Sequence, residues 1–174
     1  KLTYLLEQVL FCISKESSRN YGTVGYFHKI GKNTLRLVGS DGYRLSYCDI
    51  DTPMPEVFLT KGICLSKRAL GEILRLCSEG SETITFAHTE TTLRVSVDNC
   101  QVYMLLSGVK YPAYQSVLPK KLSNTARVSR TEFQTTARRV LLAADKTRAL
   151  QLNFTTAELA LKSKTQGSTE GSEN

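Results

Sequence analysis

The strongest constraint on the fold is a pattern that occurs twice, in which one amphipathic helix is followed by three strand-like segments. In residues 2–15, apolar side chains recur at steps of three and four, which predicts a helix with one buried stripe. Strand-like segments follow at residues 23–29, 34–39 and 45–50. Pure α/β winding would alternate single strands with helices, so this order predicts an α+β fold with helices on mainly antiparallel sheet.

The second occurrence of the pattern begins with a strand predicted at residues 57–64. Ser66 is a suitable N-cap for a helix over residues 67–77. Residues 35–38 and 93–96 are similar in sequence, which indicates an internal repeat of architecture. The three strands of this half are predicted at residues 83–87, 93–97 and 101–106.

A tight turn is predicted between the second and third strands of the first half. Asp41-Gly42 lies between two segments of alternating apolar and polar residues, and glycine accepts the positive φ that such turns require. The turn would present Tyr43, Arg44 and Leu45. A plain hairpin without any binding role is also compatible with this stretch.

A second motif lies in residues 111–120, which read Tyr-Pro-Ala-Tyr-Gln-Ser-Val-Leu-Pro-Lys. Together with residues 40–45, in this order and at this spacing, it resembles the bacterial sliding clamp, the beta subunit of the replicative DNA polymerase. The resemblance covers nearly the whole chain. It implies the DNA-clamp fold, with two helices packed on antiparallel sheets formed by an internal repeat, followed by a partial second copy.

The resemblance also implies a domain arrangement. Residues 1–119 match the middle domain of the three-domain clamp protomer without its first strand, residues 120–124 form a linker, and residues 125–174 open the third domain. Residues 167–174 are rich in Gly and Ser, which by composition fits a flexible tail, whereas the resemblance implies a loop that leads into another helix-strand segment. We therefore expect the chain to be a fragment of a longer protein. The elements expected after the linker are a strand, a helix and two strands, at residues 126–128, 131–142, 149–154 and 159–162.

Clamp proteins hold a short peptide motif of polymerases and repair proteins in a pocket, and the resemblance assigns this role to residues of both motifs. An apolar peptide site needs small or apolar walls and a stiff backbone, and the locked φ of Pro112 supplies stiffness. Tyr43 and Ser116 depart from the family, which commonly has a histidine and a basic residue there. Without the resemblance, Pro112 and Val117 also fit an ordinary interdomain connector. The predicted peptide-binding residues are Thr23, Val24, Ser40, Gly42, Tyr43, Arg44, Leu45, Pro112, Ser116 and Val117.

Basic residues on the predicted helices are the candidates for contact with duplex DNA. In the clamp, helices line a central hole and such residues face the phosphates without reading bases, so the contact is sequence-neutral and salt-dependent. The loop after the first helix also touches DNA in the family. Without the resemblance, the basic residues on the helices would be interpreted first as a solvated helix surface. The predicted DNA-binding residues are Arg19, Tyr21, Lys67, Arg68, Arg75, Arg138 and Arg139.

Composition argues against several other classes. The 174 residues are 41% hydrophobic and 22% charged, as in ordinary globular domains, and the net charge of +7 is compatible with a polyanionic partner. The 5 cysteines are odd in number and never in C-x-x-C spacing, which favours buried, reduced thiols in a cytosolic protein over a zinc ribbon or a disulfide framework. No apolar run approaches the roughly 20 residues that a membrane helix needs, and the first residues lack a signal-peptide layout.

Catalytic candidates are weak. His28 and His88 stand alone in the sequence. Asp41, Asp49 and Asp51 could be imagined as the metal cluster of a small hydrolase, but no histidine stands in metal-ligand spacing to them. Phosphate-binding loops and nucleophile elbows are absent from the sequence. We predict no catalytic residue, no metal site and no cofactor.

The function that the resemblance implies is that of a non-enzymatic processivity factor in DNA replication. The whole protein would close as a head-to-tail homodimer around duplex DNA, in the cytoplasm of a bacterium and associated with the nucleoid. It would bind the DNA polymerase, the clamp loader and repair proteins through their peptide motif. We expect that the 174-residue chain does not close a ring by itself. The alternative is a stand-alone nucleic-acid-binding α+β module.

Overall fold

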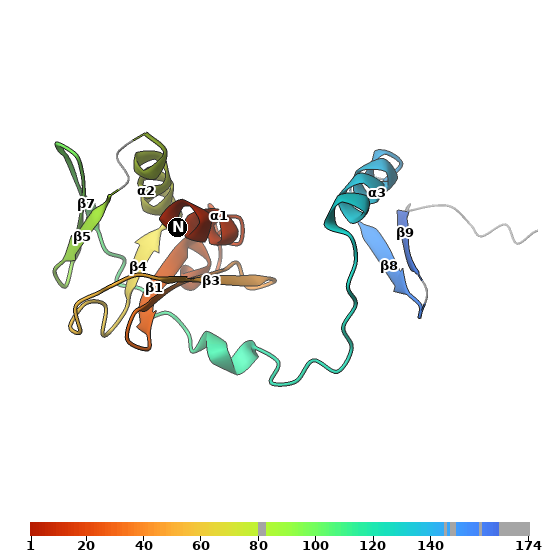
Figure 1. Cartoon of the computed structure of the whole chain (residues 1–174), viewed down its shortest axis with the longest axis horizontal. Coiled ribbons are helices and arrows are strands. Elements are labelled where there is room, and N and C mark those ends of the chain that lie inside the picture. The colour runs from red at the N-terminus through yellow and green to blue at the C-terminus, as the bar shows by residue number, and fades with distance from the viewer. Residues whose placement is uncertain (80–82, 145, 147–148, 157, 164–174) are drawn as a thin grey trace, which may run out of the picture. The chain divides into compact units, whose positions relative to one another are not determined.

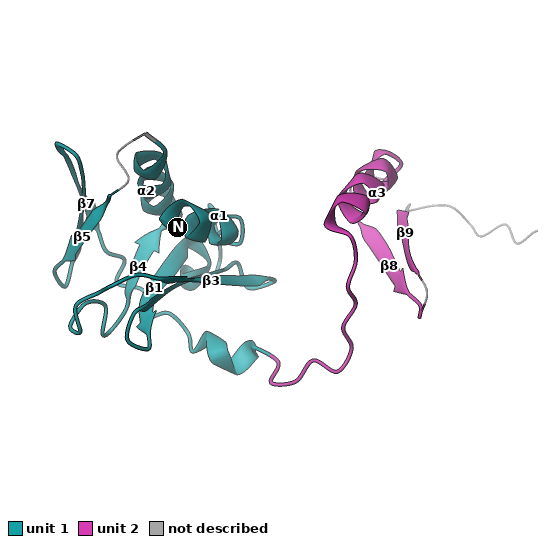
Figure 2. Ribbon diagram, in the orientation of Figure 1, with its two compact units in different colours: residues 1–118 teal, residues 119–174 magenta. Residues whose placement is uncertain are grey.

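The computed structural model describes residues 1–79, 83–144, 146, 149–156 and 158–163. They belong to two compact units, unit 1 (Lys1–Leu118) and unit 2 (Pro119–Asn174), which Figure 2 distinguishes by colour. All 8 tyrosines of the chain lie in unit 1. Tyrosine spectroscopy therefore reports on unit 1 alone.

Unit 1 repeats one arrangement, a helix followed by three hairpin-linked strands (Figure 1). The first half consists of α1 (Leu2–Leu10), η1 (Asn20–Thr23), β1 (Val24–Ile30), β2 (Thr34–Ser40) and β3 (Leu45–Asp51). The second half consists of β4 (Ile63–Ser66), α2 (Lys67–Glu79), β5 (Thr85–His88), β6 (Thr92–Val97), β7 (Cys100–Leu105) and η2 (Tyr114–Val117). The predicted α+β class and internal repeat are confirmed.

The strands of unit 1 form two antiparallel sheets, with the orders β3-β2-β1-β4 and β5-β6-β7. Strand β4 precedes α2 in the chain but pairs with β1 of the first half, so the two halves interleave. An isolated bridge between Cys64 and Ser107 ties the segment after β7 back to β4. The halves are therefore joined by backbone hydrogen bonds as well as by side-chain packing.

Helices α1 and α2 lie side by side over one face of the first sheet (Figure 1). Leu5 of α1 and Ile73 of α2 are fully buried and share one core with Leu37 and Leu93. Leu37 lies on β2 and Leu93 on β6, which are the middle strands of the two hairpin-linked trios. Residues 35–38 and 93–96, which are similar in sequence, thus occupy equivalent places in the two halves. Burial of apolar side chains in this core is the main term that stabilises unit 1, at about 25 cal/mol per Å² of apolar surface buried.

Two glycines let the helices approach the sheet closely. Gly25 on β1 and Gly39 on β2 are register partners. A Cβ atom added at Gly39 would lie 2.7 Å from Ile13 and 2.8 Å from Val9, and one added at Gly25 would lie 2.6 Å from Leu70. Carbon atoms do not approach this closely, so a larger residue at either position would displace the packed side chains.

Unit 2 is a helix packed against a two-stranded antiparallel sheet. Its elements are α3 (Arg130–Leu142), β8 (Leu150–Phe154) and β9 (Leu159–Ser163). Ser129 caps α3, since its Oγ accepts a hydrogen bond from the amide of Glu132 at 3.3 Å. None of the residues of α3 is buried, and Leu142 and Phe154 are exposed. The helix and the two strands lie within one residue of their predicted bounds.

The first helix is shorter than predicted. It ends at Leu10 instead of near Lys15, and the chain then turns so that Ile13 is buried. The amide of Ser14 donates to the carbonyl of Gly22 at 2.8 Å, which holds this turn against η1. The apolar spacing continues past the helix because Ile13, which lies in the turn, is also buried. Apolar spacing alone does not distinguish such a residue from one in the last turn of a helix.

The strand predicted over residues 57–64 is wrong for most of its length. Leu59 has a φ of 56°, a left-handed conformation that interrupts a strand, and its side chain is buried in the core. Only Ile63–Ser66 pairs, as β4. The strand predicted at residues 126–128 is also wrong, since these described residues are exposed and belong to no strand.

The cysteines are free thiols, but not all of them are buried as predicted. Cys12 and Cys64 are buried, and burial raises the pKa of the Cys64 thiol to about 11. Cys100 is exposed because it opens the edge strand β7. Within the described ranges, the helices are all too short or too polar to cross a membrane.

The glycine pair gives a test of the packing between helices and sheet. Gly39→Ala should destabilise unit 1 by about 1–3 kcal/mol, because the new methyl group overpacks the contact with Val9 and Ile13. Gly71→Ala should instead stabilise it by about 0.5–1 kcal/mol, since Gly71 lies inside α2 with open space around it. Urea unfolding followed by tyrosine fluorescence measures both changes. Equal effects of the two substitutions would contradict the proposed role of Gly39.

Candidate functional site

The two sequence motifs line one pocket in unit 1, with a volume of about 400 Å³. One wall is the loop of residues 40–45 between β2 and β3. The other wall is residues 108–118, which we call the connector; it follows β7 and includes η2. The lining residues are Arg19, Tyr21, Ser40, Gly42, Tyr43, Arg44, Leu45, Tyr111, Pro112, Ala113, Tyr114, Ser116 and Val117.

The loop of residues 40–45 is held by its own side chains. The Asp41 carboxylate accepts hydrogen bonds from the amides of Tyr43 and Arg44 at 3.0 and 3.1 Å. These two amide hydrogen bonds lower the pKa of Asp41. Gly42 has a φ of 92°, which other residues rarely adopt, and its amide donates to Ser40 Oγ at 3.1 Å. The predicted tight turn is confirmed, and it leaves the Tyr43 side chain 99% exposed.

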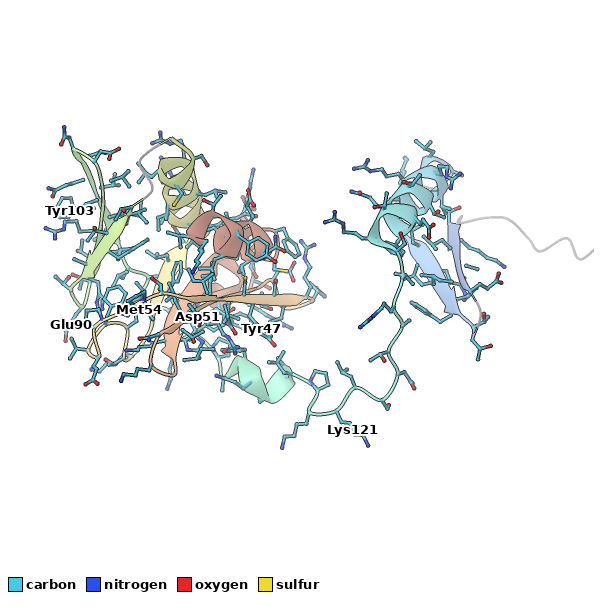
Figure 3. The ribbon with its side chains drawn as sticks, in the orientation of Figure 1. Tyr47, Asp51, Met54, Glu90, Tyr103 and Lys121 are labelled. Atoms are coloured by element: carbon cyan, nitrogen blue, oxygen red, sulfur yellow. The ribbon has the colours of Figure 1, made fainter. Side chains whose placement is uncertain are left out.

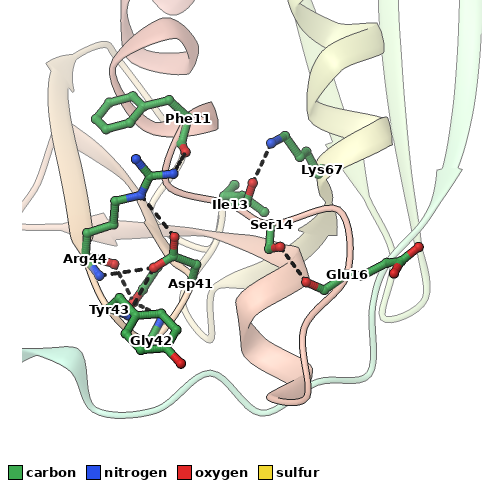
Figure 4. A network of polar contacts seen from close by, with 10 residues as sticks. Phe11, Ile13, Ser14, Glu16, Asp41, Gly42, Tyr43, Arg44 and Lys67 are labelled. Atoms are coloured by element: carbon green, nitrogen blue, oxygen red, sulfur yellow. Dashed lines mark hydrogen bonds and ion pairs between the residues drawn. The ribbon is translucent and has the colours of Figure 1, made fainter. Parts of the chain in front are cut away.

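Two arginines brace this loop, and Figure 4 shows one of them, Arg44, with its partners Asp41 and Phe11. Arg44 pairs with Asp41 at 3.0 Å and donates from Nη2 to the carbonyl of Phe11 at 2.8 Å. Arg19, a predicted DNA-binding residue, donates from Nη1 to the carbonyl of Gly42 at 3.3 Å. The loop is therefore fastened to the segment that follows α1.

The connector is fastened to the sheet by Tyr114, which is only 3% exposed. Its hydroxyl lies 3.0 Å from His28 Nε2 and 3.1 Å from Arg36 Nη1. Arg36 in turn donates to both carboxylate oxygens of Asp49, at 2.6 and 2.7 Å. Burial, and then the nearby Arg36, lower the pKa of His28. Tyr114 thus joins the second motif to three neighbouring strands.

A stack of aromatic rings fixes the start of the connector. The Tyr111 ring lies parallel to that of Tyr26, with centroids 5.1 Å apart, and meets the ring of Tyr21 edge-on at 6.2 Å. The Tyr111 hydroxyl is buried without a hydrogen-bond partner among the described residues. Burial raises the pKa of this hydroxyl well above its usual range.

Most of the predicted peptide-binding residues come together in the pocket, but Thr23 and Val24 do not line it. Val24 is buried and pairs with Ser66 of β4, while Thr23 Oγ1 donates to the carbonyl of Asn20 within η1. Both side chains are therefore engaged within unit 1 outside the pocket, Val24 in the first sheet and Thr23 in η1. The predicted residues in the lining are Ser40, Gly42, Tyr43, Arg44, Leu45, Pro112, Ser116 and Val117.

Sequence reasoning missed five lining residues. Tyr111, Ala113 and Tyr114 lie inside the second motif, so the motif itself was the available signal. Arg19 and Tyr21 were predicted as DNA contacts, and only the contacts of Arg19 with Gly42 and of Tyr21 with Arg19 and Tyr111 reveal their place in the pocket wall.

The predicted DNA-binding residues on helices differ in their surroundings. Lys67 is half-buried and donates to the carbonyl of Ile13 (Figure 4). Arg75 is exposed and pairs with Glu72 at 3.1 Å. The remaining residues are exposed on α2 or on α3 of unit 2, and are Arg68, Arg138 and Arg139.

The three aspartates considered for a metal site lie in separate contacts. Asp41 caps its own loop and Asp49 pairs with Arg36. Asp51 accepts a hydrogen bond from Thr34 Oγ1 at 2.9 Å. In the part of the chain that the structure describes, there is no cluster of three or more His, Cys, Asp or Glu side chains able to hold a metal ion.

The two connector tyrosines give a matched test of what fastens the pocket wall. Tyr114→Phe should destabilise unit 1 by about 1–3 kcal/mol, because it leaves His28 and Arg36 without a buried partner. Tyr111→Phe removes a hydroxyl that makes no hydrogen bond among the described residues, and should be neutral or slightly stabilising.

Both variants are compared by urea unfolding followed by tyrosine near-ultraviolet circular dichroism. The control is Tyr103→Phe, which removes an exposed hydroxyl on β7 (Figure 3) and should change stability by less than about 0.5 kcal/mol. The reverse order, with Tyr111→Phe more damaging than Tyr114→Phe, would show that the Tyr111 hydroxyl, and not that of Tyr114, holds the connector.

Comparison with known proteins identifies relatives for nearly the whole chain. A beta sliding clamp from Pseudomonas putida is 24% identical over 166 residues, covering 93% of this chain and 44% of the relative. One from Borreliella burgdorferi is 28% identical over 158 residues, covering 90% of this chain and 40% of the relative. The chain thus spans less than half the length of these curated relatives.

Solved structures of sliding clamps share the fold. A sliding clamp (DNA polymerase III subunit beta) from Bartonella birtlesii, bound to griselimycin, superposes with a TM-score of 0.80 at 31% identity, covering 92% of this chain and 44% of that one. A beta sliding clamp from Caulobacter crescentus gives a TM-score of 0.83 at 23% identity, covering 95% and 45%. The predicted DNA-clamp fold is therefore confirmed.

The family model for the central domain of the DNA polymerase III beta subunit matches residues 1–113, which is more than half of the chain. These residues include both sheets of unit 1, the loop of residues 40–45 and the start of the connector. The chain therefore belongs to the DNA polymerase III beta subunit family, and residues 1–113 are the part that matches the model of its central domain.

Proposed function

We propose that this chain forms the central part of a sliding clamp, a ring that encloses duplex DNA and tethers the replicative polymerase to it. The observation that carries the proposal is the pocket between the two motifs, which are far apart in the sequence and meet in space. The family membership disfavours the alternative of a stand-alone nucleic-acid-binding module. The tether needs binding and no bond-breaking chemistry, so the proposed role is non-enzymatic.

The pocket suits a short peptide with apolar side chains. Leu45, Pro112 and Val117 supply apolar walls, and the exposed edge carries polar groups that can fix the orientation of a ligand. Among the residues that the structure describes, the charged side chains in its lining are Arg19 and Arg44 and none is acidic, so the pocket favours peptides without basic residues. The proposed occupants are the binding motifs of the DNA polymerase, the clamp loader and repair proteins.

The proposed contact with DNA is sequence-neutral and weak. Arg68, Arg138 and Arg139 are exposed on helices and would face phosphates. Lys67 and Arg75 already have protein partners, and Arg139 also donates to Thr136 Oγ1 at 3.4 Å. In a ring formed by a head-to-tail homodimer, enclosure would keep the clamp on DNA and the weak contact would let it slide. The cytoplasm, and the nucleoid in it, is the compartment that this role requires.

Peptide binding tests the proposed pocket. A labelled peptide that contains Gln and ends in Leu-Phe should bind the 174-residue chain with a Kd on the order of 0.1–1 mM, because an open pocket buries little of the ligand. Val117→Asp should weaken binding roughly tenfold, since it places a charge against apolar ligand atoms. Fluorescence anisotropy measures both affinities.

The matched control for this experiment is Val57→Asp. Val57 is 80% exposed and Val117 is 70% exposed, but Val57 lies outside the pocket lining. The control should bind the peptide as the wild-type chain does. Equal weakening by both substitutions, or no saturable binding up to several millimolar peptide, would refute a peptide pocket at this place.

DNA binding separates the clamp from the stand-alone module. Since enclosure and not contact is proposed to hold the clamp, the 174-residue chain should bind a linear duplex with a Kd weaker than about 100 μM at 150 mM salt. Arg68→Glu should lower the residual low-salt affinity by a few-fold, as the loss of one phosphate contact predicts. A Kd in the low micromolar range at 150 mM salt would favour the stand-alone module.

A further inference from the structure

A row of polar side chains lies directly behind the pocket, on the face of the first sheet that is turned away from α1 and α2. His28, Arg36 and Asp49 occupy neighbouring strands as successive register partners, His28 with Arg36 and Arg36 with Asp49. Neighbouring Phe27 and Leu37 point to the helices and are buried in the core, so the row belongs to the opposite face. Tyr114 of the connector covers the row and contacts two of its members.

The chemistry of the donors decides where the protons lie. The Arg36 guanidinium can only donate, so the Tyr114 oxygen accepts from Arg36 Nη1 at 3.1 Å. The Tyr114 proton is then directed to His28 Nε2 at 3.0 Å, and that nitrogen must carry a lone pair to accept it. The contact is therefore made by neutral His28 with its proton on Nδ1. If His28 were protonated, both His28 and Arg36 would point donors at the Tyr114 oxygen. The hydroxyl proton of Tyr114 would then have lost His28 as its acceptor.

The surroundings of His28 favour the neutral ring. The side chain is 9% exposed and stacks on Tyr26 of β1, with ring centroids 4.8 Å apart. On the neighbouring strand β2, His28 faces Arg36, whose positive charge disfavours a second cation at His28. Asp49 of β3 lies beyond Arg36 and forms an ion pair with it. Burial and Arg36 together hold the pKa of His28 below its ordinary value of 6.5.

We propose that neutral His28 is a positioning residue of the peptide pocket. Its Nε2 accepts a hydrogen bond from the Tyr114 hydroxyl and so fastens the connector, and protonation of the His28 ring breaks this hydrogen bond and releases the connector. Tyr114 opens η2, and Ser116 and Val117 follow it within the same turn. Loss of the Tyr114 contact therefore loosens the wall that carries Val117. The inference rests on the proposed function of the pocket, but the state of the connector can be measured without any peptide.

The test compares the wild-type chain with His28→Gln and His28→Phe between pH 7.5 and pH 5.0. The Gln side-chain oxygen can accept the Tyr114 proton and does not titrate, whereas Phe removes the acceptor at every pH. The probe is an acetylated and amidated peptide without ionisable side chains, so that its own charge stays constant. Since the neutral ring makes the contact, wild-type affinity should be full at pH 7.5 and fall roughly three- to tenfold as the pH drops through the His28 pKa.

His28→Gln should bind with near wild-type affinity and without this pH dependence, and His28→Phe should bind weakly throughout. His88→Gln is the control, because His88 lies on β5 and packs against Phe58 instead of the connector. It should reproduce the wild-type pH profile. If the affinity of the wild-type chain were as independent of pH as that of His28→Gln, the inference about His28 would be overturned. The proposal of a peptide pocket would not be affected.

Amide hydrogen exchange of the connector provides the readout that needs no ligand. Exchange at residues 114–118, corrected for the intrinsic pH dependence, should become faster at low pH in the wild-type chain and not in His28→Gln. If the peptide does not bind at any pH, the proposed function fails while the exchange still decides the role of His28. Equal corrected exchange in both chains would overturn that role.

Discussion

The candidate site depends on the buried contact of the Tyr114 hydroxyl with His28 and Arg36. One wall of the pocket, the loop of residues 40–45, is held from within: Asp41 accepts from the Tyr43 amide, and Ser40 Oγ accepts from the Gly42 amide and donates to the Arg44 carbonyl. The connector forms no strand beside the sheet, so side chains must hold it in place. Tyr114 and the ring stack of Tyr111 do this, and they convert a linking segment into a pocket wall.

The register of the first sheet sets both the core and the site. Because side chains alternate between faces, Phe27 and Leu37 enter the core beneath the helices, while their neighbours His28 and Arg36 face the connector. A shift of the strand register by one residue would exchange the two faces of the sheet and so remove both the core packing and the candidate site. The close approach of the helices at Gly39 restricts any such shift, and so the tight packing on one face preserves the geometry of the other.

Local signals in the sequence were enough to predict most of the fold. Apolar periodicity gave the helices, Ser66 marked the start of α2, and its Oγ indeed accepts from the Ala69 amide at 3.2 Å. The errors lie where tertiary contacts override local pattern, as at Leu59, which enters the core from a left-handed turn, and at Ile13, which is buried beyond the helix end. Hydrophobic spacing alone predicts neither the burial of a residue outside a helix or strand nor the sign of its φ angle.

For the site, motifs identified the two walls, but not the residues that hold them together. His28 stood in the sequence as an isolated histidine, and Asp49 as a member of an imagined metal cluster. Their roles follow from cross-strand register with Arg36, a relation between residues of different strands. Arg19 illustrates the same point, since its charge suggested DNA whereas its hydrogen bond to Gly42 supports the pocket. A charged residue that is engaged in bracing a loop contributes less to a phosphate-binding surface, so Arg19 is better explained as part of the pocket than as a DNA contact.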